Sequence, residues 1–525
     1  MTGPGTITPA DAPAPTASVT TSAGRAPAPR AMAAIRLLIA LAAAAPIGVY
    51  LWIALHRLGY PYELDWMEGG SVELAARVVA GHSLYVVPSL HFVGWTYTPL
   101  YYWLAAAVAK VTGVGFFTLR LVSVVASIVS MTVLARMVTR DGADRIAGLV
   151  AAGLFAAAFV VSGAWFDTGR VDSLFVALTL VTLAWGLRAR SRRDGLVFGA
   201  LAFLAFFTKQ TALVALVPAL TLLLVTRRRV ALPALATLAV LVLGSTLLLD
   251  ATSDGWYRFY VFSELAGQPW APGEWVQFWT RDILGHEWPL VVLAGAGAVA
   301  GVRPKAKRRA AMAVLSSPVA YLVVASVGLI VAALISRVHT GGYANVLIPA
   351  YAATALLAGL ACAELLRTRR PIINVLVAGV LLLQLGLLAY PIGAQIPTAA
   401  DRAAGAELLQ RLRGLRGPVI VLRHPWYATV TGHGSFAQGE GITDVLRSAN
   451  LRGATVLRAS LPGALDADHI QAVVLDGGFD AHVFGPQLTR EFHLVSGPIT
   501  RRRLYPLTDV LTAPTLLYVR DRPAP

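Results

Sequence analysis

Long apolar segments, separated by short arginine-rich clusters, constrain the fold of this chain more than any other feature. Hydrophobic residues make up 56% of its 525 positions and charged residues only 14%, whereas about 25% of the residues of a soluble protein are charged. Apolar runs of roughly 20 residues cross a bilayer as helices. The sequence therefore predicts a mainly α fold, a polytopic transmembrane helical bundle in the cell membrane.

The basic residues indicate how the segments are oriented. The formal net charge is +16, but the basic side chains lie in short clusters between apolar runs, as in the cytoplasmic loops of membrane proteins. This distribution argues against a nucleic-acid partner, and it predicts a cytoplasmic N-terminus. The clusters lie at 136–145, 188–193, 227–229, 305–309 and 367–370.

Composition divides the chain into three parts. Residues 1–30 are rich in Pro, Ala, Thr and Ser and predict a disordered cytoplasmic tail. Residues 31–391 hold the apolar runs of a transmembrane domain, with about eleven crossings and one partial span at 98–112, which is short for a bilayer. Residues 396–525 are more polar and predict a small soluble extracytoplasmic α/β domain. Its expected strands are 419–423, 472–476 and 515–519, and its expected helices are 400–413 and 442–447.

The first outer loop, 56–97, carries Glu63, Asp65 and Glu68 within six positions. Carboxylates beside a bilayer are costly to desolvate, so they usually face water, a partner or a substrate. An ordinary hydrated loop is the plain alternative. The helical spacing of residues 71–80 further predicts a short helix lying on the membrane surface.

The other outer loops contain a set of residues that could share one cavity, because hydropathy places these loops on the same face. A carboxylate base, cationic groups and aromatic platforms together suit an anionic lipid headgroup that carries a sugar. The candidates are Arg170, Asp172, Lys209, Trp256 and Arg258 (both in the Trp-rich outer loop 250–287), Arg337, His339 and Tyr343.

Each of these candidates also has a structural interpretation. Trp256 and its neighbours would suit an interfacial aromatic belt. Arg170 and Asp172 could form a structural ion pair at a helix end. Lys209 could extend its ammonium group to the interface, and His339 is more often a hydrogen-bonded residue than a catalytic one. The single cysteine, Cys362, lies in an apolar run and excludes an intramolecular disulfide.

Seven short motifs occur in the order in which they occur in a known family. They are Leu-Asp-Trp-Met-Glu-Gly at 64–69, the segments 80–85, 97–104 and 120–123, Arg-Val-Asp-Ser-Leu at 170–174, and the segments 207–213 and 342–349. On these motifs the chain resembles the GT-C superfamily of integral-membrane glycosyltransferases, near the protein mannosyltransferase and lipid A aminoarabinose transferase branch.

The resemblance implies a hexosyl- or pentosyltransferase that takes sugar from a polyprenyl-phosphate donor on the outer face of the membrane. The acceptor would be a hydroxyl of a glycan, a lipid or a protein. The presumed family base corresponds to Asp65, with Glu68 as its acidic neighbour and Glu63, nearby, as a substrate-binding residue. Arg170 and Lys209, with Arg337, correspond to residues that hold the donor phosphate. A single displacement would invert the anomeric centre.

Some relatives bind a divalent cation such as Mg²⁺ or Mn²⁺ at the acidic loop, but Asp65 and Glu68 alone are too few ligands to define a metal site. Two other functions are compatible with an aromatic outer cavity. A transporter or flippase of a lipid-linked saccharide would more often show internal repeats and ionisable residues near the bilayer midplane. A non-catalytic envelope-assembly protein would tolerate replacement of Asp65.

Overall fold

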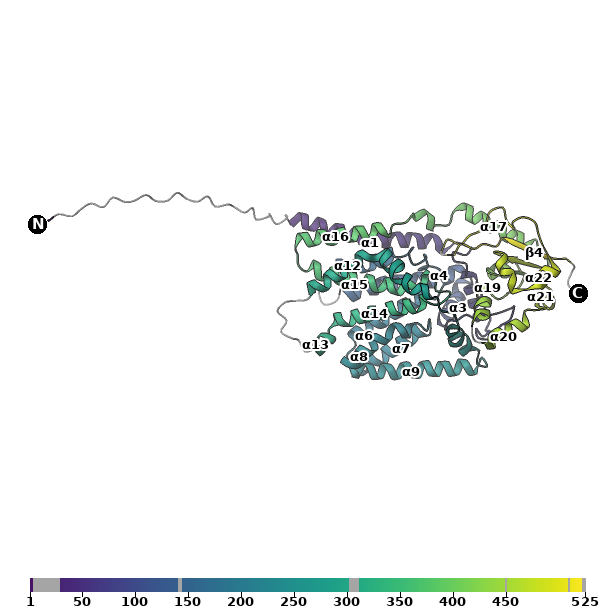
Figure 1. Ribbon diagram of the computed structural model, residues 1–525, viewed down its shortest axis with the longest axis horizontal. Coiled ribbons are helices and arrows are strands. Elements are labelled where there is room, and N and C mark those ends of the chain that lie inside the picture. Colours follow the sequence, from purple (N-terminus) through teal and green to yellow (C-terminus); the bar gives the residue numbers. More distant parts are fainter. Residues whose placement is uncertain (3–28, 140–143, 302–310, 449–450, 509, 522–525) are drawn as a thin grey trace.

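The computed structural model describes residues 1–2, 29–139, 144–301, 311–448, 451–508 and 510–521. The predicted disordered tail therefore falls almost wholly outside the described residues, as do Arg140 and the basic cluster at 305–309. Figure 1 shows long helices running alongside one another, with the start of the first helix at one end of the bundle and the β-strands at the other. The mainly α fold and the small C-terminal sheet are as predicted.

Twelve of the helices between residues 29 and 387 correspond to the apolar runs of the sequence. Apolar side chains on all faces of these helices suit burial in a bundle or in lipid. They are α1 Pro29–Leu58, α3 Leu100–Thr112, α4 Phe116–Val138, α5 Arg145–Ala157, α6 Asp172–Arg188, α7 Arg192–Phe206, α8 Ala212–Thr226, α9 Arg228–Ala251, α12 Gly285–Gly301, α14 Pro318–Arg337, α15 Ile348–Leu366 and α16 Pro371–Leu387.

Six helical spans within the described residues are long and apolar enough to cross a membrane, or seven if the bent pair Pro371–Leu387 and Ile392–Arg413 is counted as one span. The chain is thus a multi-pass membrane protein. The other four predicted crossings correspond to α5, α6, α7 and α8, which have 13 to 17 residues, and the predicted partial span at 98–112 corresponds to α3, with 13 residues. Since a bilayer core needs about 20 residues of untilted helix, the expectation of eleven crossings stays a prediction.

Short elements join the long helices to one another and to the C-terminal region. They are α2 Glu68–Val79, α10 Trp256–Arg258, the π-helices η1 Phe259–Glu264 and η2 Phe278–Leu284, α11 Pro272–Gln277, α13 Ala311–Leu315, and the 3₁₀ helices η3 Ala344–Leu347 and η4 Ile392–Gln395. Capping boxes start two of the longer helices: the Ser191 hydroxyl accepts from the Asp194 N–H at α7, and the Thr398 hydroxyl accepts from the Asp401 N–H at α17.

The C-terminal region contains a four-stranded sheet in the order β1-β2-β4-β3, in which β1 and β2 are parallel and β4 is antiparallel to both neighbours. The three predicted strands and two predicted helices are present, and β3 is an additional strand. The elements are α17 Ala399–Arg413, β1 Val419–Val421, α18 Pro425–Val430, α19 Gly439–Arg447, α20 Leu451–Ser460, α21 Ala464–Ala467, β2 Ala472–Leu475, η5 Gly478–Val483, α22 Pro486–Glu491, β3 Phe492–Leu494 and β4 Leu516–Arg520.

The sheet shares its hydrophobic core with the outer loops. One cluster of buried side chains includes Leu64 and Trp66 from the first loop, Tyr257 from α10, and Val421 and Val473 from the sheet. Burial of this continuous apolar surface favours the association of the C-terminal region with the loops. The C-terminal region is therefore docked onto the end of the bundle that carries these loops.

The helix predicted at 71–80 is present as α2, but it does not lie on a membrane surface. Residues 68–75 are buried, and the Glu73 carboxylate accepts hydrogen bonds from the hydroxyls of Thr429 and Ser435. The expected solvent face is thus covered by the C-terminal region. Periodicity identified the helix correctly, but it carried no information about this covering segment.

Candidate functional site

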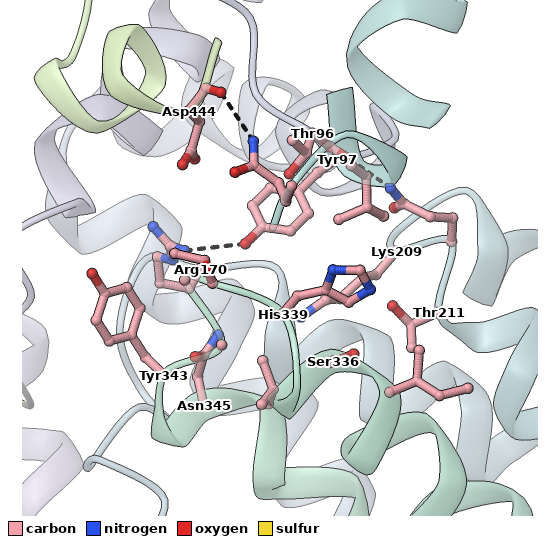
Figure 2. A pocket seen from close by; sticks show the side chains of 18 of the residues that line it. Thr96, Tyr97, Arg170, Lys209, Thr211, Ser336, His339, Tyr343, Asn345 and Asp444 are labelled. Atoms are coloured by element: carbon pink, nitrogen blue, oxygen red, sulfur yellow. Dashed lines mark hydrogen bonds between the residues drawn. The ribbon is translucent and has the colours of Figure 1, made fainter. Parts of the chain in front are cut away.

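A cavity of about 240 Å³ lies where the outer loops meet the C-terminal region. Its wall combines cations, hydroxyls, a histidine and aliphatic side chains from segments far apart in the sequence (Figure 2). The residues that line it are Met67, Thr96, Tyr97, Arg170, Lys209, Gln210, Thr211, Val214, Leu265, Gln268, Ile335, Ser336, His339, Thr340, Gly341, Gly342, Tyr343, Asn345, Val346, Glu440 and Asp444.

Arg170 is the most informative residue of this wall. It lies in the loop that precedes α6, and its side chain is only 3% exposed. Its Nη2 donates to the Tyr97 hydroxyl at 3.3 Å (Figure 2), and its guanidinium lies 5.0 Å from the Trp165 ring. Within the described part of the chain, Nε and Nη1 have no hydrogen-bond partner. Buried donors of this kind are costly unless a ligand or water satisfies them.

Lys209 provides the second cation of the wall. It lies in the turn between α7 and α8, and its Nζ donates to Asp172 Oδ1 at 2.7 Å. Burial lowers the pKa of Lys209, but Asp172 more than reverses this effect and raises it. Asp172 is thus the partner that keeps Lys209 charged in a buried position, and the other ammonium protons remain available for a second acceptor.

Asp65 is fully buried and lies next to Arg170, with 4.0 Å between Oδ2 and Arg170 Nη1. The Met67 N–H donates to Oδ2 at 3.3 Å, while Oδ1 is buried without a partner among the residues described. Burial raises the pKa of Asp65 to about 8, and Arg170 opposes this shift. A carboxyl group with this pKa is a stronger base than an exposed carboxylate once it is deprotonated.

Glu68, three residues further on, has a different environment. Both of its oxygens accept from Arg120, at 2.8 Å from Nε and 2.6 Å from Nη2. Backbone N–H groups of Gly169 and Leu64 add contacts at 2.7 and 2.9 Å. The carboxylate is saturated and 0% exposed, so its geometry is that of a structural ion pair, and the predicted catalytic role of Glu68 stays a prediction.

Glu63 does not line the cavity, contrary to its predicted contact with substrate. Its Oε2 forms a short hydrogen bond with His424 Nδ1, and His424 Nε2 lies 2.9 Å from Asp476 Oδ2. All three groups are buried. Glu63 therefore connects the first outer loop with the C-terminal region.

Four other predicted binding residues also lie outside the cavity wall. Asp172 reaches it only as the partner of Lys209. Trp256 packs against Phe259 and the Arg452 guanidinium. Arg258 has a side chain that is 66% exposed and pairs with Asp250 at 3.6 Å. Arg337 is held by Asp282 and Glu274 and donates to the Gly342 carbonyl, so it supports the lining loop from behind. His339 and Tyr343, in contrast, are part of the wall, and Trp270 lies against the His339 ring.

Sequence reasoning missed two acidic residues of the cavity, Glu440 and Asp444, because they come from α19 of the C-terminal region. Asp444 binds Arg447 through a short contact, and Glu440 lies 3.3 Å from Arg423. Burial and the neighbouring Glu440 raise the pKa of Asp444 to about 7. The helical pattern of 442–447 was visible in the sequence, but its docking onto the outer loops was not.

The acidic loop does not offer a set of metal ligands. Glu68 is saturated by Arg120 and backbone donors, and Asp65 faces a guanidinium, which repels a cation. No group of three or more His, Cys, Asp and Glu side chains suitable for a metal ion occurs among the residues that the structure describes.

Comparisons with known proteins agree with this fold. Residues 96–249 match the family model "Dolichyl-phosphate-mannose-protein mannosyltransferase". The crystal structure of ArnT from Cupriavidus metallidurans bound to undecaprenyl phosphate superimposes with a TM-score of 0.59 at 15% identity, covering 90% of this chain and 97% of that chain. The chain has a GT-C fold. The apo structure of the same ArnT gives a TM-score of 0.58 at 15% identity and the same coverage.

This GT-C fold extends over the bundle and the C-terminal region alike, because the ArnT match covers both.

A more distant structure, the Archaeoglobus fulgidus oligosaccharyltransferase tethered with an acceptor peptide, matches with a TM-score of 0.44 at 13% identity, over 82% of this chain and 69% of that chain. No curated protein matches the chain in sequence.

Proposed function

We propose that this protein is a membrane glycosyltransferase that moves a sugar from a polyprenyl-phosphate-linked donor to an acceptor hydroxyl, with inversion at the anomeric carbon. The observation that carries the proposal is Arg170, a buried guanidinium with two unpartnered donors among the described residues, in the wall of a cavity. The ArnT match supports the donor class, since that structure is described as bound to undecaprenyl phosphate.

Arg170 and Lys209 would hold the donor phosphate. Arg170 supplies Nε and Nη1 in a planar fork that suits phosphate oxygens, and Lys209 supplies a point charge. Tyr97 lies over both cations, with Arg170 donating to its hydroxyl and the Lys209 Nζ 5.5 Å from its ring. The phosphate would thus meet two preorganised positive charges in a site of low dielectric.

Asp65 would accept the proton of the acceptor hydroxyl. The hydroxyl oxygen forms a bond to the anomeric carbon, the bond from that carbon to the phosphate oxygen breaks, and polyprenyl phosphate leaves with the electron pair. Asp65 is not itself a lining residue, but it contacts two residues of the wall, Arg170 and Met67. Movement of Arg170 toward a bound phosphate would therefore release Asp65 for the acceptor at the same time as it stabilises the leaving group.

The reaction would take place on the outer face of the membrane. Helix α6 starts at Asp172, which pairs with the cavity residue Lys209, and ends at Arg188, so the basic cluster at 188–193 lies at the opposite end of the bundle. The cluster that begins at Arg227 follows the far end of α8 in the same way. Because basic clusters favour the cytoplasm, the cavity and the C-terminal region would be extracytoplasmic.

The test is sugar transfer from radiolabelled polyprenyl-phosphate donors in membranes that contain the wild-type protein or Asp65→Asn at equal amounts. Product from the wild type alone supports an inverting transferase with Asp65 as the base. Equal product from both proteins contradicts that role for Asp65. Absence of product with every donor, combined with movement of the labelled lipid across the membrane, would instead favour a flippase.

A further inference from the structure

The residues on both sides of Asp65 are held by the C-terminal region. The Tyr427 hydroxyl contacts the Glu63 N–H at 3.0 Å. The Leu64 carbonyl accepts from both the N–H and the hydroxyl of Thr508, at 3.0 and 2.7 Å. The Arg423 guanidinium lies 5.2 Å from the Trp66 ring. The segment that carries the proposed base is thus fixed from more than 350 positions away in the sequence, as the separation of 364 between Glu63 and Tyr427 shows.

His424 is the centre of this contact. Its Nδ1 forms a short hydrogen bond with Glu63 Oε2, and its Nε2 lies 2.9 Å from Asp476 Oδ2. Both partners are carboxyl groups, and when both are ionised an imidazolium ring, with a proton on each nitrogen, donates to both of them. It is 1% exposed and stacks on Tyr427 with 5.9 Å between the ring centroids. Arg423 lies on the other side, engaged by Asp480 at 2.8 Å.

We infer that His424 is a positioning residue for transfer: by bridging Glu63 and Asp476, it holds the loop around Asp65 in its reactive geometry. This inference rests on the proposed function, in which Asp65 is the base. It assigns a role to the C-terminal region that the cavity alone does not explain. His424 touches neither the cavity nor Asp65, so it would act only through Glu63 and the backbone of the loop.

The physical reason is the balance of buried charge. Without the imidazolium, Glu63 and Asp476 would be two buried carboxylates without a cation between them, and Glu63 would also face Glu68 in the same loop. The loop would then move until water reached Glu63. Burial lowers the pKa of His424, but Asp476 and Glu63 more than reverse this and raise it to about 10, so the bridge is intact at neutral pH. A displacement of about 1 Å in a catalytic group costs on the order of 100-fold in rate.

The chain provides a matched control in His433. This histidine is also buried in the C-terminal region, with its ring nitrogens 2.7 Å from the carbonyl oxygens of Gly417 and Leu412. Its hydrogen bonds do not involve the first loop. Replacement of either histidine by glutamine removes a buried ring with two hydrogen bonds, but only His424→Gln removes the contact with Glu63.

The experiment compares His424→Gln with His433→Gln in the full-length protein in lipid nanodiscs. We expect His424→Gln to lower kcat by about 10- to 100-fold with little change in KM for the donor lipid. Amide hydrogen exchange should become faster in 59–69 and stay unchanged in 339–347, while His433→Gln should change neither kcat nor exchange in 59–69. If His424→Gln does not accumulate as folded protein, Asp476→Asn is measured in its place. This variant keeps the His424 ring, and we expect the same fall in kcat and the same faster exchange in 59–69.

The two readouts separate this inference from the proposed function. Unchanged kcat and exchange in His424→Gln, or equal losses in both histidine variants, would overturn the positioning role while wild-type transfer still stood. If the wild type transfers no sugar from any donor, the proposed function fails. The exchange of 59–69 then decides alone whether His424 holds the loop: faster exchange in His424→Gln only supports it, and equal exchange in all proteins overturns it.

Discussion

Two of the buried arginines at the end of the bundle beside the C-terminal region, Arg120 and Arg170, have very different hydrogen bonds. Arg120 uses Nε, Nη1 and Nη2 in contacts with Glu68 and with the carbonyls of Arg57, Tyr60 and Tyr62. Arg170 has one hydrogen bond to Tyr97 and a 4.0 Å contact with Asp65, and two of its nitrogens have no partner in the described structure.

The difference between Arg120 and Arg170 distinguishes a charge that stabilises the fold from one that is available to a ligand. A buried ion pair is tolerated when further hydrogen bonds complete it, as for Arg120 and Glu68. A buried charged group whose hydrogen-bond donors are unsatisfied costs free energy of folding. Where such donors lie beside a cavity, a bound ligand can satisfy them. The sequence distance between Asp65 and Glu68 is three residues, but the two carboxylates belong to different classes because their partners differ.

The largest effect should come from Asp65→Asn. We expect transfer to fall about 1000-fold, in the range for loss of a general base, while the protein stays folded. Because burial raises the pKa of Asp65 above its unfolded value, its charged form destabilises the fold as pH rises toward 8. The apparent melting temperature of Asp65→Asn at pH 9 should therefore equal or exceed that of the wild type. A melting temperature below that of the wild type would show that the Asp65 carboxylate stabilises the fold, as that of Glu68 does.

Glu68→Gln should show the opposite pattern. Loss of this carboxylate leaves the Arg120 guanidinium buried without a counter-charge, which costs about 3–5 kcal/mol. We expect a low yield of folded protein and a lower melting temperature, with residual activity per folded molecule. A well-folded Glu68→Gln protein without activity would return Glu68 to the catalytic residues.

Arg170→Lys tests the unsaturated arginine. The ammonium keeps the charge but loses the planar fork, and hydrogen bonds to charged groups contribute about 1.5–3 kcal/mol. We expect KM for the donor lipid to rise about 10- to 100-fold with little change in melting temperature. Arg120→Lys is the matched control, since it should lower the melting temperature strongly. Similar behaviour of both variants would remove the distinction between the two arginines.

The pH dependence of transfer should follow Asp65. A base must be deprotonated to act, and the pKa of Asp65 is raised to about 8, so kcat/KM should increase from pH 6 and level off above pH 8. This parameter reports the free enzyme. Measurement of kcat/KM across this range, with the folded fraction checked at each pH, tests the expectation. A rate that falls as pH rises from 6 to 8 would contradict it.

Arg258→Ala should have the smallest effect. The Arg258 side chain is 66% exposed and forms a 3.6 Å pair with Asp250, and exposed pairs contribute little. We expect unchanged donor KM and kcat, and a stability change within about 0.5 kcal/mol. A clear rise in KM would show that α10 contacts the substrate after all and would enlarge the site beyond the cavity wall.

Much of the fold followed from patterns that are local in the sequence. Apolar runs predicted the membrane bundle, and short β-like runs predicted β1, β2 and β4. The strand β3, with the sequence Phe-His-Leu, has too few residues to show alternation. The resemblance to GT-C glycosyltransferases agrees with the fold, and Arg170, Lys209, His339 and Tyr343 do meet at one cavity.

The sequence by itself determined the chemical types at the site: acids in the first outer loop, and cations in the loops that hydropathy assigns to the same face. Only the tertiary structure decided which acid is saturated and which is not, because saturation depends on partners such as Arg120 and Gly169, which are 52 and 101 positions from Glu68. The same reason applies to His424 and Glu63, which are 361 positions apart. Periodicity reports which face of an element is apolar; the groups that meet that face come from packing of the whole chain.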